Sequence, residues 1–381
     1  MNYSMIFYII GWILDVEAAL LVPSLAVSLI YHESCALAFF ITIVLCLIPG
    51  LILVRKQPKN KVFYAREGSV TVALSWIVMS IMGSIPFLLS GSITNPVDAL
   101  FETVSGFTTT GASILPAVEP LQHGILFWRS FTHWIGGMGV LVFVLVLTSL
   151  DKKNTMYLMR AEVPGPEKDK LVPKAMATAR ILYGMYFALT AVEIVLLFLG
   201  GMTPFDSIIH AFSTAGTGGF SNYANSIGQL DSAYIDGVIT VFMILFGINF
   251  NLFYLLLLRQ FKPVWKNEEL RTYLAIIATA IALITWNITS IYGNPLKAFR
   301  YAAFQVASII TTPGFSTADY IKWPTMSQTI IIILMIIGAC ASSTGGGIKV
   351  SRFLIVVKSI KKELKQMVHP KSVNLIRING K

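Results

Sequence analysis

Long apolar segments recur eight times in this sequence and restrict it to one class of fold. Each is roughly 20 residues or longer, the length at which an α-helix crosses the hydrocarbon core of a bilayer. Because 55% of the 381 residues are hydrophobic and only 13% are charged, the composition argues against one or two soluble domains and predicts an all-α polytopic membrane protein. The predicted spans cover residues 5–31, 35–54, 69–91, 124–150, 174–200, 233–258, 270–292 and 326–358.

The basic residues are confined to alternate connections between these segments. Lys and Arg are concentrated in 55–66, 152–174, 259–271 and from 349 onward, whereas 91–123 and 201–232 contain none and 291–325 has three. The positive-inside rule therefore predicts that the basic loops and both termini are cytoplasmic. The net charge is +10, but the sequence has no basic stripe with interleaved aromatic residues. We therefore expect the lipid bilayer, and no nucleic acid, as a partner.

Chemistry-bearing side chains do not form a catalytic set. Cys35, Cys46 and Cys340 lie in apolar surroundings without metal-ligand spacing, so we expect packing residues. A membrane-embedded enzyme would need paired aspartates, a histidine-rich metal cluster or a Ser/His dyad, and the sequence offers none of these. It therefore predicts a protein that is not an enzyme and has no cofactor.

A nine-residue pattern, S-x-x-x-T-x-G-x-S, occurs three times in register. Its copies are residues 105–113, 213–221 and 308–316. Three copies with the same hydroxyl positions, each between apolar segments, indicate internal repetition. Three ordinary surface turns are the alternative, but such turns need not share these positions.

Each copy follows a semi-apolar run that is too short to cross a membrane. The runs begin with Asn95-Pro96, Thr203-Pro204 and Asn294-Pro295, in which a capping side chain precedes a proline at the first helical position. About 13 helical residues at 1.5 Å each give some 20 Å, enough to enter the membrane but not to cross it. The predicted fold is therefore an N-terminal helix pair followed by three span–re-entrant pore helix–span repeats.

A short helix followed by a Thr-x-Gly loop predicts a site for a monovalent cation. Irregular backbone is tolerated at membrane depth only against protein or a water-filled cavity. Glycine allows the loop to turn its carbonyls toward one axis, where they replace the hydration shell of the ion. The carbonyl end of the half-helix dipole adds negative potential there. We expect the hydroxyls of Ser105, Ser213 and Ser308 to anchor the loops from behind.

Six motifs resemble those of the TrkH/KtrB potassium-uptake subunits. They are Thr108–Ser113, Gly218–Ser221, Thr311–Ser316, Ser343–Lys349, Arg160–Pro166 and Trp134–Gly139. The resemblance covers essentially the whole chain and favours the TrkH branch, which also has the extra N-terminal helix pair. It implies a channel-like potassium translocator that forms homodimers and is gated by a cytosolic nucleotide-binding subunit of the TrkA kind. The expected location is the bacterial inner membrane.

Carried over by motif, the resemblance assigns the potassium-binding filter. It places this filter at Thr109, Thr110 and Gly111, at Thr217, Gly218 and Gly219, and at Thr312, Pro313 and Gly314. One aligned glycine per loop, in place of the TVGYG pattern, implies looser selectivity than in a true potassium channel. Pro313 stands where we would expect alanine; proline removes an amide donor but keeps the carbonyl.

The family has a fourth repeat, whereas this sequence ends at Lys381, soon after the third. Filters of this design use four loops around the ion, so three leave one wall open. A fragment, a separate polypeptide carrying the last quarter and a defective product are the alternatives, and we favour the fragment. The predicted function is potassium uptake. The alternative is a non-conducting remnant or accessory subunit that needs a separate fourth repeat.

Three consecutive glycines, Gly345, Gly346 and Gly347, interrupt the last predicted span and are followed by Lys349. Each glycine costs a helix interior about 1 kcal/mol relative to alanine, so the helix should open there. The intramembrane gating loop of the family supports a flexible gate under the filter. The alternative is a close helix–helix contact made by small residues.

Ionisable side chains at membrane depth are functional by default. Glu102 lies on the first half-helix and Arg129 near the start of the next span, which predicts a supporting pair behind the filter; plain surface exposure is the alternative. His133 and His210 have no second ligand at metal spacing and are expected in the core. Asn249 and Asn251 are expected to form hydrogen bonds between helices.

These observations give five predicted segments. They are 1–66 (N-terminal helix pair), 67–151 (first pore repeat), 152–258 (second pore repeat with a cytoplasmic linker), 259–360 (third pore repeat with the glycine-rich gate) and 361–381 (basic cytoplasmic tail).

Overall fold

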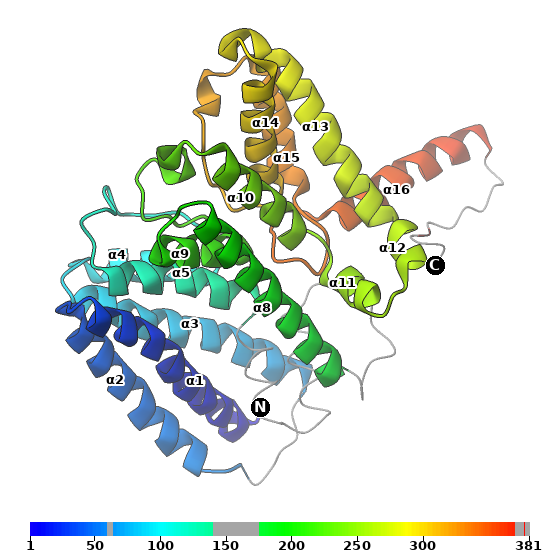
Figure 1. Ribbon diagram of the computed structural model, residues 1–381. Helices are drawn as coiled ribbons and strands as arrows, with labels where there is room; N and C mark the ends of the chain where they lie inside the picture. The colour runs from blue at the N-terminus through cyan, green and yellow to red at the C-terminus, as the bar shows by residue number, and fades with distance from the viewer. Residues whose placement is uncertain (59–63, 140–174, 370–376, 378–381) are drawn as a thin grey trace. The chain divides into compact units, whose positions relative to one another are not determined.

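Helices are the regular elements of the described part of the chain, which confirms the predicted all-α class (Figure 1). The computed structural model describes residues 1–58, 64–139, 175–369 and 377. Within these residues, five helices are long and apolar enough to cross a membrane. The chain divides into two units, Met1–Ser226 and Ile227–Lys381.

The first unit contains the N-terminal hairpin and the helices around the first two copies of the repeated pattern. Its elements are α1 (Tyr3–Ile30), α2 (Cys35–Arg55), α3 (Ala65–Leu89), α4 (Pro96–Phe107), α5 (His123–Gly137), α8 (Ala175–Leu199) and α9 (Pro204–Ala215). Helix α5 ends at Gly137; the rest of the predicted span 124–150 from residue 140, and the linker 152–174, lie outside the described residues.

The turn between α1 and α2 fastens the N-terminal hairpin to α5. Glu33 in this turn accepts hydrogen bonds from the amides of His123 (2.7 Å) and Gly124 (2.9 Å), at the start of α5. Partial burial raises the pKa of the Glu33 carboxyl, but the hydrogen bonds from these amides and from the His123 side chain lower the pKa by a larger amount. The pKa of Glu33 therefore lies below its ordinary value.

Replacing Glu33 with alanine is expected to lower the free energy of unfolding by about 2 kcal/mol at pH 7 because two charge-assisted bonds are lost. A carboxyl with a depressed folded-state pKa stabilises the fold above its unfolded pKa of about 4.3, and this contribution disappears as pH falls through the folded value. Denaturation in detergent, followed by tryptophan fluorescence at pH 7 and pH 3, measures both effects. The exposed Glu363 is the control; equal losses for Glu33→Ala and Glu363→Ala would contradict the capping role.

The second unit contains the third copy of the pattern. Its elements are α10 (Ala233–Phe246), α11 (Phe250–Leu257), α12 (Phe261–Trp265), α13 (Glu268–Tyr292), α14 (Pro295–Ile310), the short 3-10 turn Tyr320–Lys322, α15 (Thr325–Ile337) and α16 (Val350–Val368). Helix α14 packs against α10, α13 and α15. A 3-10 turn at Ser226–Leu230 spans the boundary in sequence between the two units.

Three half-helices precede the repeated loops. Helices α4 and α9 have 12 residues each, and α14 has 16, which gives about 18 and 24 Å of length. The predicted caps are present: the side chains of Asn95, Thr203 and Asn294 accept hydrogen bonds from amides of the first turn, at 2.9, 3.0 and 2.9 Å. Each half-helix therefore begins at its Asn/Thr-Pro pair and is too short to cross a bilayer.

Two predicted spans are broken in the structure. The segment 233–258 is not one helix, because α10 and α11 meet at a bend of 91°. Asn249 does not join two helices as expected; its side chain caps α11 by accepting from the amide of Asn251 at 2.9 Å. The last span is interrupted between α15 and α16, over residues 338–349 rather than over the glycine triplet alone.

The two breaks are hydrogen-bonded to each other. The amide of Cys340 donates to Gly247 O (3.1 Å), and the amide of Phe250 donates to Ser342 O (3.0 Å). The Thr344 hydroxyl donates to the carbonyl of Phe246 (3.2 Å). Each break therefore supplies partners for backbone groups that the other leaves without helical bonds.

Candidate functional site: three loops after the half-helices

Left-handed backbone recurs at the same two positions of the repeated pattern. We call residues 108–113 loop one, 216–221 loop two and 311–316 loop three. The threonines Thr109, Thr217 and Thr312 have φ of 54°, 55° and 72°. The aligned glycines Gly111, Gly219 and Gly314 have φ of 73°, 83° and 79°. The three loops thus share a backbone conformation, and not only a sequence pattern.

The residue between each threonine and glycine is not left-handed. A backbone that alternates between left-handed and ordinary φ turns successive carbonyls toward one side, whereas a regular strand points them to opposite sides. A β-branched residue at positive φ costs about 1–3 kcal/mol. The loops therefore hold their threonines in a conformation that is disfavoured for a β-branched residue.

Backbone carbonyls of the half-helices hold loops one and two. Ser105 O accepts from the amide of Thr110, and Ser213 O from the amide of Gly218, both at 2.9 Å. The hydroxyls of Ser105 and Ser213 have no hydrogen-bond partner among the described residues. The expected anchoring by serine hydroxyls is therefore absent from these two loops, where the main chain does that work.

Loop three differs because Pro313 has no amide hydrogen. The amide of Gly314 takes its place and donates to Ser308 O at 3.3 Å. Here the Ser308 hydroxyl does anchor the loop, since it donates to the carbonyl of Phe315 at 2.7 Å. In loop three, therefore, the amide that donates to Ser308 O shifts from the position of Pro313 to Gly314, and the Ser308 hydroxyl adds a second hydrogen bond.

Arg129 of α5 connects loops one and two. Its Nε lies 2.8 Å from Glu102 Oε1, and both side chains are at most 2% exposed. Its other nitrogens donate to the Ser113 hydroxyl (3.2 Å) and to the carbonyl of Ser221 (3.3 Å). The guanidinium also lies 4.1 Å from the centroid of the Phe220 ring. The structure therefore places the predicted pair in the core, and not on the surface.

His133, one turn further along α5, packs against loop two. Its ring stacks on Phe220 with 4.1 Å between centroids, while its Nε2 has no partner among the described residues. A side chain at Gly218 would collide with this ring, and one at Gly216 with the carbonyl of His133. Glycine is thus required in loop two for close approach as well as for conformation.

The glycine-rich break lies directly against loop three. The amide of Gly346 donates to the Thr312 hydroxyl at 2.8 Å, and a Cβ on Gly345 would lie 2.9 Å from the carbonyl of Thr311. The Lys349 ammonium donates to the carbonyl of Gly345. The predicted gate residues and the third predicted filter loop are therefore in contact.

Glu269 of α13 is hydrogen-bonded to the glycine-rich break and to the helix that follows it. Its Oε1 accepts from the amide of Ala341 at 2.7 Å and from the amide of Ser351 at 3.2 Å. One acceptor therefore reaches both the start of the break and the first turn of α16.

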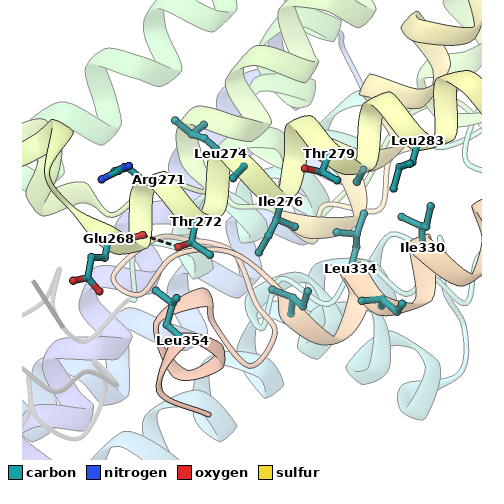
Figure 2. A pocket seen from close by; sticks show the side chains of 14 residues that line it. Glu268, Arg271, Thr272, Leu274, Ile276, Thr279, Leu283, Ile330, Leu334 and Leu354 are labelled. Carbon is teal, nitrogen blue, oxygen red and sulfur yellow. Dashed lines mark hydrogen bonds between the residues drawn. The ribbon is translucent and has the colours of Figure 1, made fainter. Parts of the chain in front are cut away.

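A separate groove of about 890 Å³ runs between α13 and α15 (Figure 2). Aliphatic side chains such as Leu283, Ile330 and Leu334 line most of it, and Glu268 and Arg271 lie at one end. None of the predicted filter or gate residues lines this groove. An apolar groove does not replace the hydration shell of a cation, so the loops remain the candidate site.

Two features of the site were not predicted from the sequence. The left-handed threonines were not expected because glycine alone was assigned positive φ, and only the shared register of the threonines could have indicated them. The aromatic contacts of Phe220 with Arg129 and His133 were also missed. Among the described residues, no group of three or more His, Cys, Asp or Glu side chains could hold a metal ion.

The model of the TrkH family of cation transport proteins matches residues 36–381. This chain belongs to the TrkH family. It is 36% identical over 388 residues to the Trk system potassium uptake protein TrkH of Salmonella typhimurium, a match that covers 100% of this chain and 80% of the relative. It is 34% identical to TrkG of Escherichia coli, over 97% of this chain and 78% of that protein.

The crystal structure of the potassium transporter TrkH from Vibrio parahaemolyticus matches with a TM-score of 0.88 and 32% identity. The match covers 100% of this chain and 80% of that one. The family membership confirms a polytopic membrane transporter and not an enzyme. The chain spans about four fifths of the length of these TrkH relatives.

Proposed function

We propose that this TrkH-family chain takes up potassium through a channel-like pore with a backbone-carbonyl filter. The observation that carries the proposal is the left-handed Thr-x-Gly backbone that recurs in all three loops. The relatives are named as potassium uptake proteins, and potassium is the substrate of the proposed reaction. No covalent step is involved.

The proposed filter is formed by the carbonyls of three residues in each loop. They are Thr109, Thr110 and Gly111, Thr217, Gly218 and Gly219, and Thr312, Pro313 and Gly314. Each loop follows the carbonyl end of a half-helix, which ends at Phe107, Ala215 or Ile310. The negative end of the helix dipole favours a cation at these loops.

The proposed gate is the break formed by Gly345, Gly346, Gly347 and Lys349. Its bond from Gly346 to Thr312 (2.8 Å) supports a barrier that closes the exit below loop three. Movement of the break away from Thr312 would open the path.

We further propose an inner-membrane orientation with cytoplasmic termini, a homodimer, and gating by a TrkA-like nucleotide-binding subunit, as the charge distribution and the family resemblance favour.

Gly314→Ser tests the filter without disturbing packing. A Cβ on Gly314 would meet no atom within 4 Å, and the residue has φ of 79°. Serine at that φ is strained by about 1–3 kcal/mol, so we expect rubidium-over-sodium discrimination to fall about tenfold. Radioactive rubidium and sodium uptake into proteoliposomes measures this ratio.

Gly293→Ser is the matched control. Gly293 ends α13 with φ of 65° and equally open space around its Cα, so serine there suffers the same strain away from loop three. We expect unchanged discrimination for this variant. Unchanged discrimination for Gly314→Ser as well would contradict the filter assignment, and absence of any rubidium uptake would contradict the transport proposal.

A further inference from the structure

One polar side chain on each half-helix is bonded to the serine that ends the repeated pattern. It lies nine residues before the aligned glycine, and the serine lies two residues after that glycine. The pairs are Glu102 with Ser113 (3.0 Å), His210 with Ser221 (3.0 Å) and Gln305 with Ser316 (3.3 Å). The three pairs occupy equivalent places, although Glu, His and Gln share no simple chemical type.

Burial makes these contacts unlike incidental polar pairs. Glu102, His210 and Gln305 are at most 1% exposed, and a buried polar group requires a hydrogen-bond partner. A partner could lie anywhere around the half-helix. In all three repeats, one hydrogen-bond partner of this side chain is the equivalent serine of the loop. This contact accounts for the last shared position of the internal pattern.

The loop-one contact is acidic and extends to the main chain. Glu102 accepts from the Ser113 hydroxyl through Oε1 and from the amide of Ile114 (3.0 Å) through Oε2. Arg129 neutralises the carboxylate, with its Nε 2.8 Å from the same Oε1. This contact therefore fixes two consecutive residues after the filter glycine.

The loop-two contact fixes the tautomer of His210. Its Nδ1 lies 2.8 Å from the carbonyl of Asp206, which can only accept, so Nδ1 carries the proton. Nε2 is then the acceptor for the hydroxyl of Ser221. The same hydroxyl oxygen accepts from the amide of Tyr223 at 3.1 Å, so both of its roles are used.

The loop-three contact uses a neutral amide. Gln305 Nε2 donates to the Ser316 hydroxyl and to the carbonyl of Ala318, which lies at 2.8 Å. The Ser316 hydroxyl also donates to Ala318 O at 3.1 Å. The outgoing segment is thus bonded to the half-helix at two residues, as in loop one.

We propose that these three pairs are struts that fix the outgoing end of each loop to its own half-helix and thereby set the position of the filter carbonyls. Glu102, His210 and Gln305 are positioning residues, because each acts on the ion through the loop. The inference rests on the proposed filter. Its new content is that selectivity depends on three side chains behind the loops as well as on the glycines.

Loop two offers a clean test, since its strut, unlike that of loop one, contains no ion pair. We expect Ser221→Ala and His210→Phe each to lower rubidium-over-sodium discrimination in proteoliposomes about fivefold, the effect of losing the hydrogen bond between these two side chains. The double variant should be no worse than either single variant, because both remove the same contact. His210→Gln, which provides the group found in loop three, should retain discrimination within about twofold.

Ser207→Ala is the control on the same half-helix. Ser207 is buried, and its hydroxyl donates to the carbonyl of Thr203 at 2.9 Å, away from loop two. Unchanged discrimination in Ser221→Ala, or additive losses in the double variant, would overturn the struts while leaving the filter proposal standing. Absence of rubidium uptake by the wild-type chain would instead contradict the transport proposal. If His210→Phe does not fold, Ser221→Ala and Ser316→Ala decide, because each removes a single oxygen atom.

Discussion

Arg129→Met is expected to destabilise this chain by about 3–5 kcal/mol, because it leaves the Glu102 carboxylate buried without its counter-charge. The pair is at most 2% exposed, with 2.8 Å between Nε and Oε1. Arg129 also contacts Ser113 and the carbonyl of Ser221, so loops one and two both lose a support. Denaturation of the purified protein in detergent, followed by tryptophan fluorescence, measures the loss.

A double variant separates the ion pair from packing. Glu102→Leu combined with Arg129→Met removes both charges and should recover a large part of the stability, since an apolar pair of similar volume replaces a buried ion pair at little cost. Arg271→Met changes an exposed arginine on α13 and should fall within about 0.5 kcal/mol of wild type. A loss of less than 1 kcal/mol for Arg129→Met would show that the pair is not a buried support.

Lys349→Met is expected to raise rubidium flux about tenfold. The Lys349 ammonium donates to the carbonyl of Gly345, and the neighbouring Gly346 donates to Thr312 of loop three. A hydrogen bond from a charged donor contributes about 1.5–3 kcal/mol, so its loss shifts the proposed gate toward its open arrangement. Flux into proteoliposomes under a fixed potassium gradient measures the change.

Two further variants show whether the hydrogen bond or the charge matters. Lys349→Arg keeps the positive charge but changes the donor geometry, so an increase in flux with arginine would point to the hydrogen bond. Lys361→Met removes an exposed lysine of α16 and should leave flux unchanged. If Lys349→Met lowers stability without raising flux, the glycine-rich break is a packing contact and not a gate.

Local sequence signals predicted the half-helices and their position in the repeats. Asn95, Thr203 and Asn294 each precede a proline, and capping acts within one turn, so no distant contact is needed to read it. The Thr-x-Gly register likewise located the loops. The predicted pairing of Glu102 with Arg129 needed only the charge of two residues at membrane depth.

The features that were missed depend on contacts distant in sequence. The segment 233–258 is apolar throughout its centre and reads as one span, but its break is stabilised by bonds to residues 340–344. Sequence periodicity cannot show a partner that lies about 90 residues away. The hydroxyls of Ser105 and Ser213 were expected to bond because the motif repeats, whereas their main-chain carbonyls serve instead.

The paired breaks of α10–α11 and α15–α16 also constrain how the second unit can move. Gly247 and Phe250 are hydrogen-bonded to Cys340 and Ser342. Neither break can therefore move alone without losing these main-chain hydrogen bonds. Exposed peptide groups there cost several kcal/mol each. A displacement of residues 338–349 that keeps these bonds must therefore carry Gly247 and Phe250, and with them the start of α11, along with it.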